Sequence, residues 1–247
     1  MKKALKFFIF AALAAALLVG CADKKNSEET NVSEKAGVTA NEVQKNIESA
    51  VTVSNYITGS REDGTQYYAF KSDLFKEYNL NLGITIGTGM STKLPASFPI
   101  LKSHGWNIAD AKYSGIVLKP AATTNVPCEK EGKLLTIYLK NTTENETRCS
   151  NCAVNRIKFD LYSKDDGYEE KISQAPAFSF ENGINNDTDM KGIISIMGEP
   201  SDVSYLIEDG LCTELSISYQ NVSKNDSIKF GLTPDGAKIT SVDYSIQ

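Results

Sequence analysis

The chain has 247 residues and a formal net charge of −5, from 26 basic and 31 acidic residues, and 41% of its residues are hydrophobic. An acidic balance without Lys and Arg clusters in the body of the chain argues against a nucleic-acid partner, because phosphates recruit basic side chains. The length suffices for one large or two small domains.

The first 20 residues are predicted to be a signal segment. Lys2, Lys3 and Lys6 form a basic start, and residues 7–19 are 13 uninterrupted apolar residues. This apolar run fits a secretory signal, whereas a membrane span needs about 20 residues. Because the segment holds three lysines and no acid, its removal leaves 227 residues with 23 basic against 31 acidic side chains, a net charge of −8.

The end of this segment, Leu18-Val19-Gly20-Cys21, resembles the lipobox of bacterial lipoproteins. The resemblance implies cleavage before Cys21 and attachment of a diacylglyceryl group to its sulfur. Two acyl chains on one residue meet the condition for stable membrane anchoring. The expected location is therefore the cell membrane or outer membrane, with the protein lipid-anchored and facing outside the cytoplasm. The competing interpretation, a short membrane helix with an incidental cysteine, is disfavoured by the length of the apolar run.

Residues 21–45 are expected to form a flexible tether after the lipidated cysteine, because 22–40 contain almost no large apolar side chains. A short helix is plausible from Asn41 to Ala50, since Val43 and Ile47 are four residues apart. The next part, 46–170, is predicted to be a β-rich α+β domain.

Within this domain the pattern indicates a strand from Leu82 to Gly87 and a short helix from Ser97 to His104 that ends at Gly105. Two half-buried strands are predicted at 134–139 and 154–162 from their β-branched and aromatic content. His104 falls in the last helical turn, where a cation favours the helix dipole, and no nucleophile motif accompanies it. Residues 51–81 do not give one clear pattern.

Four cysteines remain once Cys21 carries lipid, and an even number in an exported protein favours disulfides or buried thiols. Cys149 and Cys152 form a C-x-x-C that lies in a polar loop, outside the helix-start context that activates redox thiols. A zinc site would prefer a second such pair or two histidines, and the chain has one His, so we expect no metal and no cofactor. The candidate disulfide or buried-thiol positions, with three pairings open, are Cys128, Cys149, Cys152 and Cys212.

The C-terminal part, 171–247, is predicted to be a module of one helix and an antiparallel meander. Met190, Ile193, Ile194 and Met197 give the helix an apolar face. Thr188 is the expected cap, Gly198 and Pro200 end the helix, and Thr233-Pro234-Asp235-Gly236 is a tight-turn sequence. Strands are expected at 213–219, 227–232 and 238–246.

This module resembles the SmpA/OmlA (BamE) and β-lactamase-inhibitor-like group, through Gly183-Ile184, Thr188, Gly198-Glu199-Pro200 and Asp235-Gly236. It is also similar to Gram-positive lipoproteins of unknown function. The resemblance covers about a quarter of the chain and implies a surface that binds other proteins without catalysis. Only one helix is predicted here, where that group has a leading pair.

The overall fold class expected is α+β, with short helices packed on antiparallel β-sheets, in one domain or two small modules. The expected function is that of a membrane-anchored, non-catalytic binding or scaffold module for another protein, with candidate aromatic anchors at Tyr67, Tyr68, Trp106 and Tyr205. The alternatives are a thiol oxidoreductase using the C-x-x-C, a hydrolase using Asp160, Asp165 and Asp166, and a solute-capture protein. Asp165 and Asp166, with Glu169 and Glu170, are expected at a solvated hairpin end and not in a calcium loop.

Overall fold

Antiparallel strands dominate the structure, a computed structural model that describes residues 37–74, 77–89 and 91–247. The helices of this part are short: α1 (Ala40–Ala50), α2 (Phe98–Ser103), α3 (Ala111–Ser114) and α4 (Met190–Met197), with 3₁₀ turns η1 (Val53–Asn55), η2 (Ser72–Leu74) and η3 (Cys149–Asn151). The described chain is therefore a mostly-β, α+β fold.

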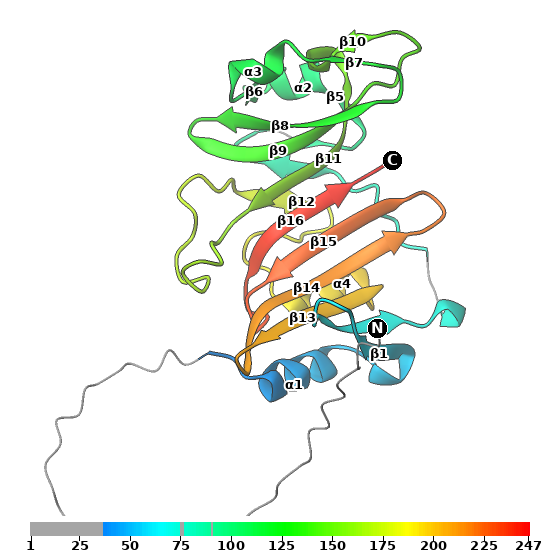
Figure 1. Ribbon diagram of the computed structural model, residues 1–247, viewed down its shortest axis with the longest axis vertical. Coiled ribbons are helices and arrows are strands. Elements are labelled where there is room, and N and C mark those ends of the chain that lie inside the picture. The colour runs from blue at the N-terminus through cyan, green and yellow to red at the C-terminus, as the bar shows by residue number, and fades with distance from the viewer. Residues whose placement is uncertain (1–36, 75–76, 90) are drawn as a thin grey trace, which may run out of the picture. The chain divides into compact units, whose positions relative to one another are not determined.

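One large sheet organises the molecule (Figure 1). Its strands are all antiparallel and follow in space the order β1 (Tyr56–Ser60), β2 (Gln66–Phe70), β13 (Asp202–Glu208), β14 (Leu211–Asn221), β15 (Asp226–Leu232), β16 (Ile239–Ser245), β11 (Ala153–Asp160), β9 (Lys133–Lys140), β8 (Thr123–Lys130) and β6 (Asn107–Ile108), and β5 (Ala96–Ser97) pairs with β11. A three-stranded sheet has the order β12 (Phe178–Phe180), β3 (Ile84–Ile86) and β4 (Ser91–Thr92), and β10 (Thr147–Arg148) pairs with β7 (Val117–Leu118).

The segments 46–170 and 171–247 both contribute strands to the large sheet. β2 pairs with β13, and β11 pairs with β16, so each segment supplies neighbours to the other in the same sheet. Residues 36–247 accordingly form one compact unit. No boundary near residue 170 divides this unit.

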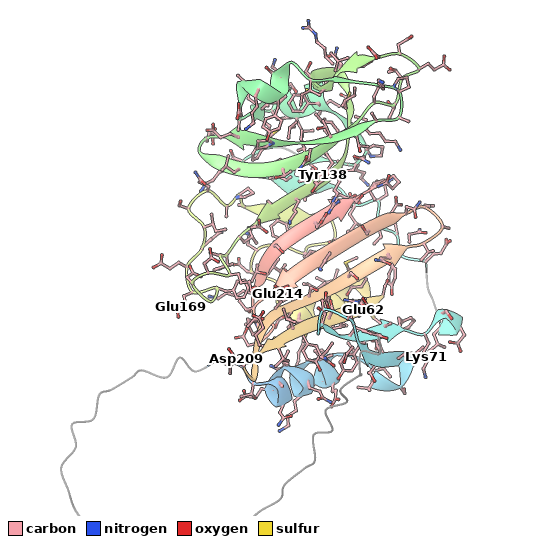
Figure 2. The ribbon with its side chains drawn as sticks, in the orientation of Figure 1. Glu62, Lys71, Tyr138, Glu169, Asp209 and Glu214 are labelled. Carbon is pink, nitrogen blue, oxygen red and sulfur yellow. The ribbon has the colours of Figure 1, made fainter. Side chains whose placement is uncertain are left out.

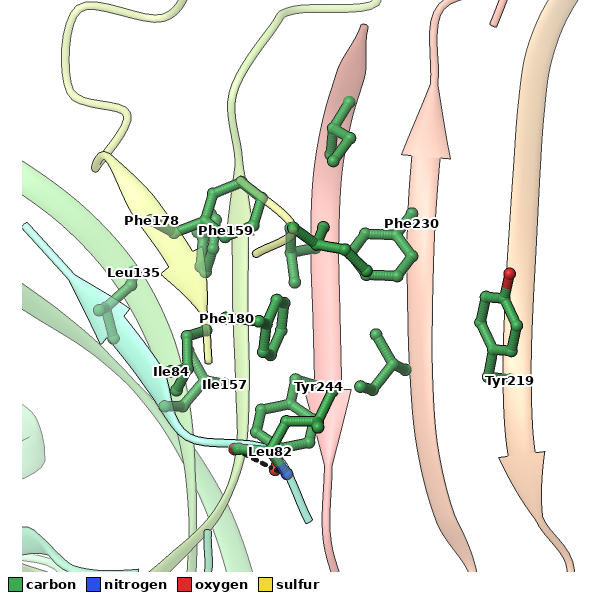
Figure 3. Close-up of a cluster of buried hydrophobic side chains, with 14 of the residues drawn as sticks. Leu82, Ile84, Leu135, Ile157, Phe159, Phe178, Phe180, Tyr219, Phe230 and Tyr244 are labelled. Carbon is green, nitrogen blue, oxygen red and sulfur yellow. Dashed lines mark hydrogen bonds between the residues drawn. The ribbon is translucent and has the colours of Figure 1, made fainter. Parts of the chain in front are cut away.

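One face of the large sheet is apolar and buried. A cross-strand row of this face consists of side chains at most 3% exposed, namely Val203, Ile217, Phe230, Val242 and Phe159. β12 packs on this row, because the Phe180 ring centroid lies 6.1 Å from that of Phe230 and Phe178 lies 5.3 Å from Phe159 (Figure 3). Aromatic pairs at such separations add to the burial of apolar area in holding two layers together.

Tyr244 of β16 fixes a coil segment against the same face. Its hydroxyl accepts a hydrogen bond from the Leu82 N–H at 3.2 Å and lies 2.9 Å from the Leu82 carbonyl and 3.0 Å from the Leu80 carbonyl (Figure 3). The phenol is fully buried, and burial raises its pKa, so the hydroxyl stays protonated and able to donate.

The helix predictions hold, with two corrections to their starts. α1 begins at Ala40, so residues 40–45 of the predicted tether are helical, and residues 21–36 of it lie outside the described residues. Thr39 and Glu42 cap α1 reciprocally, because Thr39 Oγ1 accepts from the Glu42 N–H and Glu42 accepts from the Thr39 N–H. Asp189 caps α4 in place of Thr188, since its carboxylate accepts from the Gly192 N–H at 2.7 Å while Thr188 Oγ1 accepts from the Asn185 N–H.

The strand predictions hold for β3, β9, β11, β14, β15 and β16, and the Thr233–Gly236 turn joins the last two. Gly236 there has a φ of 76°, the left-handed conformation that glycine adopts freely. The meander has one strand more than expected, since β13 precedes it. β1, β2 and β8 were also not predicted.

Candidate functional site

The second face of the large sheet is polar. Residues that alternate with the buried rows point to this face, as the two-residue period of a strand requires. Two cross-strand rows make up this face. The first row consists of Ala69, Asp202, Ser218, Lys229, Asp243, Lys158 and Thr136. The second row consists of Gln220, Ser227, Ser245, Arg156, Tyr138 and Asn125. We call the surface built from these two rows the open face.

A hollow of about 640 Å³ lies at the centre of the open face. Small side chains line its floor, because six of the residues that line it are serines, namely Ser201, Ser204, Ser216, Ser218, Ser227 and Ser245. Longer side chains, including Arg61, Arg156 and Lys229, also line it. The difference in side-chain length across this surface therefore produces the hollow.

Two arginine–aspartate pairs stand in this hollow. Arg156 binds Asp243 in a bidentate manner, with the Nε to Oδ1 distance at 2.6 Å, and its guanidinium lies 4.4 Å from the centroid of the Tyr138 ring, which Figure 2 labels. The hydrogen bond to Asp243 raises the pKa of Arg156 further. Arg61, from the β1–β2 loop, binds Asp202 at 3.0 Å. The two-point contact holds the Arg156 guanidinium in a fixed orientation, whereas Arg61 makes a single contact with its aspartate.

Two further cations on the open face have no carboxylate partner. In the part of the chain that the structure describes, Lys158 and Lys229 form no ion pair, and both are exposed. Each lies in the cross-strand row next to Asp243, which Arg156 already occupies. The open face thus offers unpaired ammonium groups and serine hydroxyls, which suit hydrogen-bond acceptors and negative charges on a binding partner.

The four candidate cysteines are buried, and their thiols are free in this structure. Cys128 lies on β8, Cys149 and Cys152 flank η3, and Cys212 lies on β14. β14 and β8 are five strand spacings apart, roughly 24 Å, so Cys212 cannot bridge to Cys128. Cys21 lies outside the described residues.

Burial also controls the chemistry of these thiols. It raises the pKa of Cys128 to about 12 and that of Cys212 to about 11, and it raises the pKa of Cys149 and Cys152. Cys149 Sγ donates to the Tyr113 carbonyl at 3.0 Å. A nucleophilic cysteine needs the opposite environment, one that stabilises the thiolate.

We therefore expect the four body thiols to resist a thiol reagent at pH 8 in the folded, reduced chain. The measurement is colorimetric thiol titration of a Cys21→Ser variant, before and after addition of denaturant. Four thiols should react only after unfolding, since the thiol form dominates well below its raised pKa and the sulfurs are shielded. One thiol reacting rapidly in the folded chain would contradict this expectation and favour the oxidoreductase alternative.

Of the three candidate hydrolase residues, Asp160, Asp165 and Asp166, the first two line the same hollow. Asp160 and Asp165 line one hollow of about 380 Å³ at the end of β11, and both are exposed. Tyr162 and Lys171 form an antiparallel bridge, so the acidic turn is the end of a small hairpin, as predicted. His104 lies elsewhere, at the C-terminal end of α2.

The candidate aromatic anchors are mostly core residues. Trp106, Tyr68 and Tyr205 are 0%, 4% and 8% exposed, so they do not offer rings to a partner. Tyr67 is the exception, because it is half-buried on the second sheet face with the Arg61 guanidinium 5.3 Å from its ring centroid. The residues of the open face itself were not singled out from the sequence. The signal for them was the alternation in Leu215-Ser216-Ile217-Ser218-Tyr219.

Within the described ranges, no helix has the length and apolar character needed to cross a bilayer. The same residues do not gather three or more His, Cys, Asp or Glu side chains in a way that could hold a metal ion. No protein-family model, curated protein or solved structure matches this chain.

Proposed function

We propose that this chain is a membrane-anchored lipoprotein of the cell envelope and that its open face binds another protein without catalysis. The observation that carries the proposal is the hollowed, polar face of a sheet whose opposite face is buried along its central strands. The lipobox resemblance of Leu18 to Cys21 supports the anchor, and the resemblance of 181–247 to protein-binding envelope modules supports the kind of partner.

The dimensions of the open face suit a protein partner. From β2 to β9 it spans six strand spacings, roughly 29 Å, and a seven-residue strand is about 23 Å long. A surface of these dimensions approaches the area of about 800 Å² that each partner contributes to a stable protein complex. The bidentate Arg156–Asp243 pair resembles the ordered arginine anchors that dominate such interfaces.

We also infer that α1 and α4 complete the cover over the apolar face, which leaves only the polar face for a partner. Supporting this packing, Val43 and Ile47 of α1 and Met190 and Ile193 of α4 are at most 3% exposed, and Ile194 and Met197 of α4 are partly buried against the core. An antiparallel sheet covered on one side commonly has its other side in contact with water or with a partner.

Catalysis is the weaker interpretation on chemical grounds. Burial raises the pKa of the C-x-x-C thiols, which disfavours the reactive thiolate, and Asp160 and Asp165 are exposed to solvent outside an enclosed cleft. Lys229 lies opposite Ser218 but is exposed, unlike the desolvated lysines that act as bases. Solute capture is disfavoured because the hollow is polar and open to solvent, whereas small-molecule sites are mostly apolar.

The proposal predicts that a bulky substitution on the open face blocks partner capture. Chemical crosslinking on intact cells, followed by mass spectrometry of the attached proteins, should recover a partner with the natural chain. Ser218→Arg fills the centre of the hollow and should reduce this recovery at least tenfold. Val222→Arg adds the same side chain at a residue that is 68% exposed in the β14–β15 turn and should leave recovery unchanged. Equal recovery with both variants would place the contact elsewhere.

A further inference from the structure

β1 is a free edge of the large sheet. It pairs with β2 on one side, and within the described residues no strand lies on its other side. The opposite edge of the sheet, β6, has only two residues. β1 is thus the longer of the two terminal strands and the better template for an added strand.

The hydrogen bonds of the β1–β2 hairpin identify which main-chain groups of β1 point away from β2. The Arg61 N–H donates to the Thr65 carbonyl at 2.8 Å, and the Lys71 N–H donates to the Asn55 carbonyl at 2.9 Å. Odd-numbered residues of β1 therefore turn their main-chain groups toward β2, and even-numbered residues turn theirs outward. The outward set comprises both groups of Thr58, both groups of Ser60 and the carbonyl of Tyr56, since the Tyr56 N–H donates to Val53.

This edge lacks the usual protection against pairing. The segment Tyr56-Ile-Thr-Gly-Ser60 contains no proline, lysine or other charged residue, and its register with β2 has no bulge. Ile57 is 58% exposed. Natural edge strands usually carry at least one such device.

We infer that β1 pairs antiparallel with β1 of a second copy of this chain, with Thr58 on the two-fold axis. In this register Thr58 faces Thr58, and Tyr56 faces Ser60, so four main-chain hydrogen bonds form across the axis. The interface is isologous, and the two large sheets continue into each other.

The side chains of β1 are self-complementary in the same register. Ile57 of one copy faces Gly59 of the other, where a Cβ would lie only 2.6 Å from Tyr67 Oη because that ring covers the glycine. The exposed Ile57 therefore meets the Tyr67 ring of the second copy, and the contact occurs twice by symmetry.

The charges at the two ends of the hairpin also match. Lys71, whose Nζ lies 2.7 Å from the Ser54 carbonyl, marks one end, and Glu62 follows the other end (Figure 2). Because Tyr56 of one copy faces Ser60 of the other, the two-fold axis brings the Lys71 end of each hairpin toward the Glu62 end of its partner. Each ammonium thus approaches a carboxylate, an arrangement that favours a second copy over an unrelated strand.

Disulfide trapping in the producing cells tests this dimer. Thr58→Cys places two thiols across the axis on Cα atoms about 5.5 Å apart, within the range that a disulfide spans. Val222→Cys is the matched control, because Val222 is 68% exposed in the β14–β15 turn and lies outside the β1–β2 hairpin. After mild oxidation, a non-reducing gel should show a dimer band for Thr58→Cys at least tenfold stronger than for Val222→Cys.

A second pair of variants separates strand pairing from chance collision. Ser60→Pro, added to Thr58→Cys, removes an outward N–H and leaves the main-chain bonds to β2 in place, and it should reduce the dimer band at least tenfold. It also loses the Ser60 hydroxyl that donates to Gln66 Oε1, a loss that it shares with the Ser60→Ala control. Ser60→Ala keeps that N–H and should preserve the band. Equal bands for Thr58→Cys and Val222→Cys, or a band unaffected by Ser60→Pro at equal protein level, would overturn the proposal.

Discussion

Replacing Phe230 with alanine should lower the free energy of unfolding by about 3–5 kcal/mol, the usual cost of removing a large side chain from a packed core. Phe230 is fully buried at the centre of the apolar face, between Ile217 and Val242 on neighbouring strands. Its ring also meets Phe180 of the small sheet, so its removal loosens the contact between two layers. Because domains are stable by only about 5–15 kcal/mol, this loss should be visible in any denaturation curve.

The matched control is the next residue along the same strand. Lys229 points to the open face, so Lys229→Ala should change the free energy of unfolding by less than about 0.5 kcal/mol. Urea denaturation of both variants, followed by circular dichroism, gives the comparison. Similar losses for the two neighbours would mean that the sheet does not have one buried and one open face.

Replacing Cys21 with serine should release the protein from the membrane. A serine hydroxyl does not replace the sulfur that the lipobox resemblance assigns to the diacylglyceryl group. Each buried methylene contributes roughly 0.8 kcal/mol, so loss of the acyl chains removes most of the affinity for the bilayer. In ultracentrifugation of lysed cells, the share of protein in the membrane pellet should fall at least tenfold.

Ala22→Ser is the control for that experiment, since it changes the neighbouring residue and keeps the thiol. It should pellet with membranes like the natural chain. If Cys21→Ser still pellets to the same extent, the chain is held at the membrane by something other than lipid on this residue, and the proposed anchor is wrong.

Local patterns in the sequence predicted elements that local interactions stabilise. α1 and α4 have apolar faces at helical spacing, and β14 to β16 alternate strictly enough for their buried sides to be read from the sequence. The hairpin of β1 and β2 also had a local signal, in the Asp63-Gly64 turn between two aromatic-containing runs, but Gly59 and the polar residues around it weakened that signal.

Local patterns of this kind could not predict which residues come together on the open face. Arg156 and Asp243 are 87 residues apart, and they meet only because β11 pairs with β16. In the same way, β13 lies beside β2 across a long separation in the chain. Strand order brings the serines of β13 to β16 into one hollow, and no spacing within a single strand contains that information.

The position of the domain boundary illustrates the same point. The sequence changes character near residue 170, where a β-rich stretch gives way to the segment that contains α4 and its meander. In the folded chain, however, β16 pairs with β11, and the aromatic side chains of β12 pack across this pairing. A shared core therefore overrides a change in local pattern.

The central claim, that the open face is the contact surface for another protein, is tested most directly by site-specific photocrosslinking in the producing cells. A photoreactive side chain at Ser218, within the hollow, should trap one partner reproducibly, whereas the same group at Val222, in the β14–β15 turn, should trap at most a tenth as much. Equal trapping at both positions, or trapping at Val222 alone, would contradict the account.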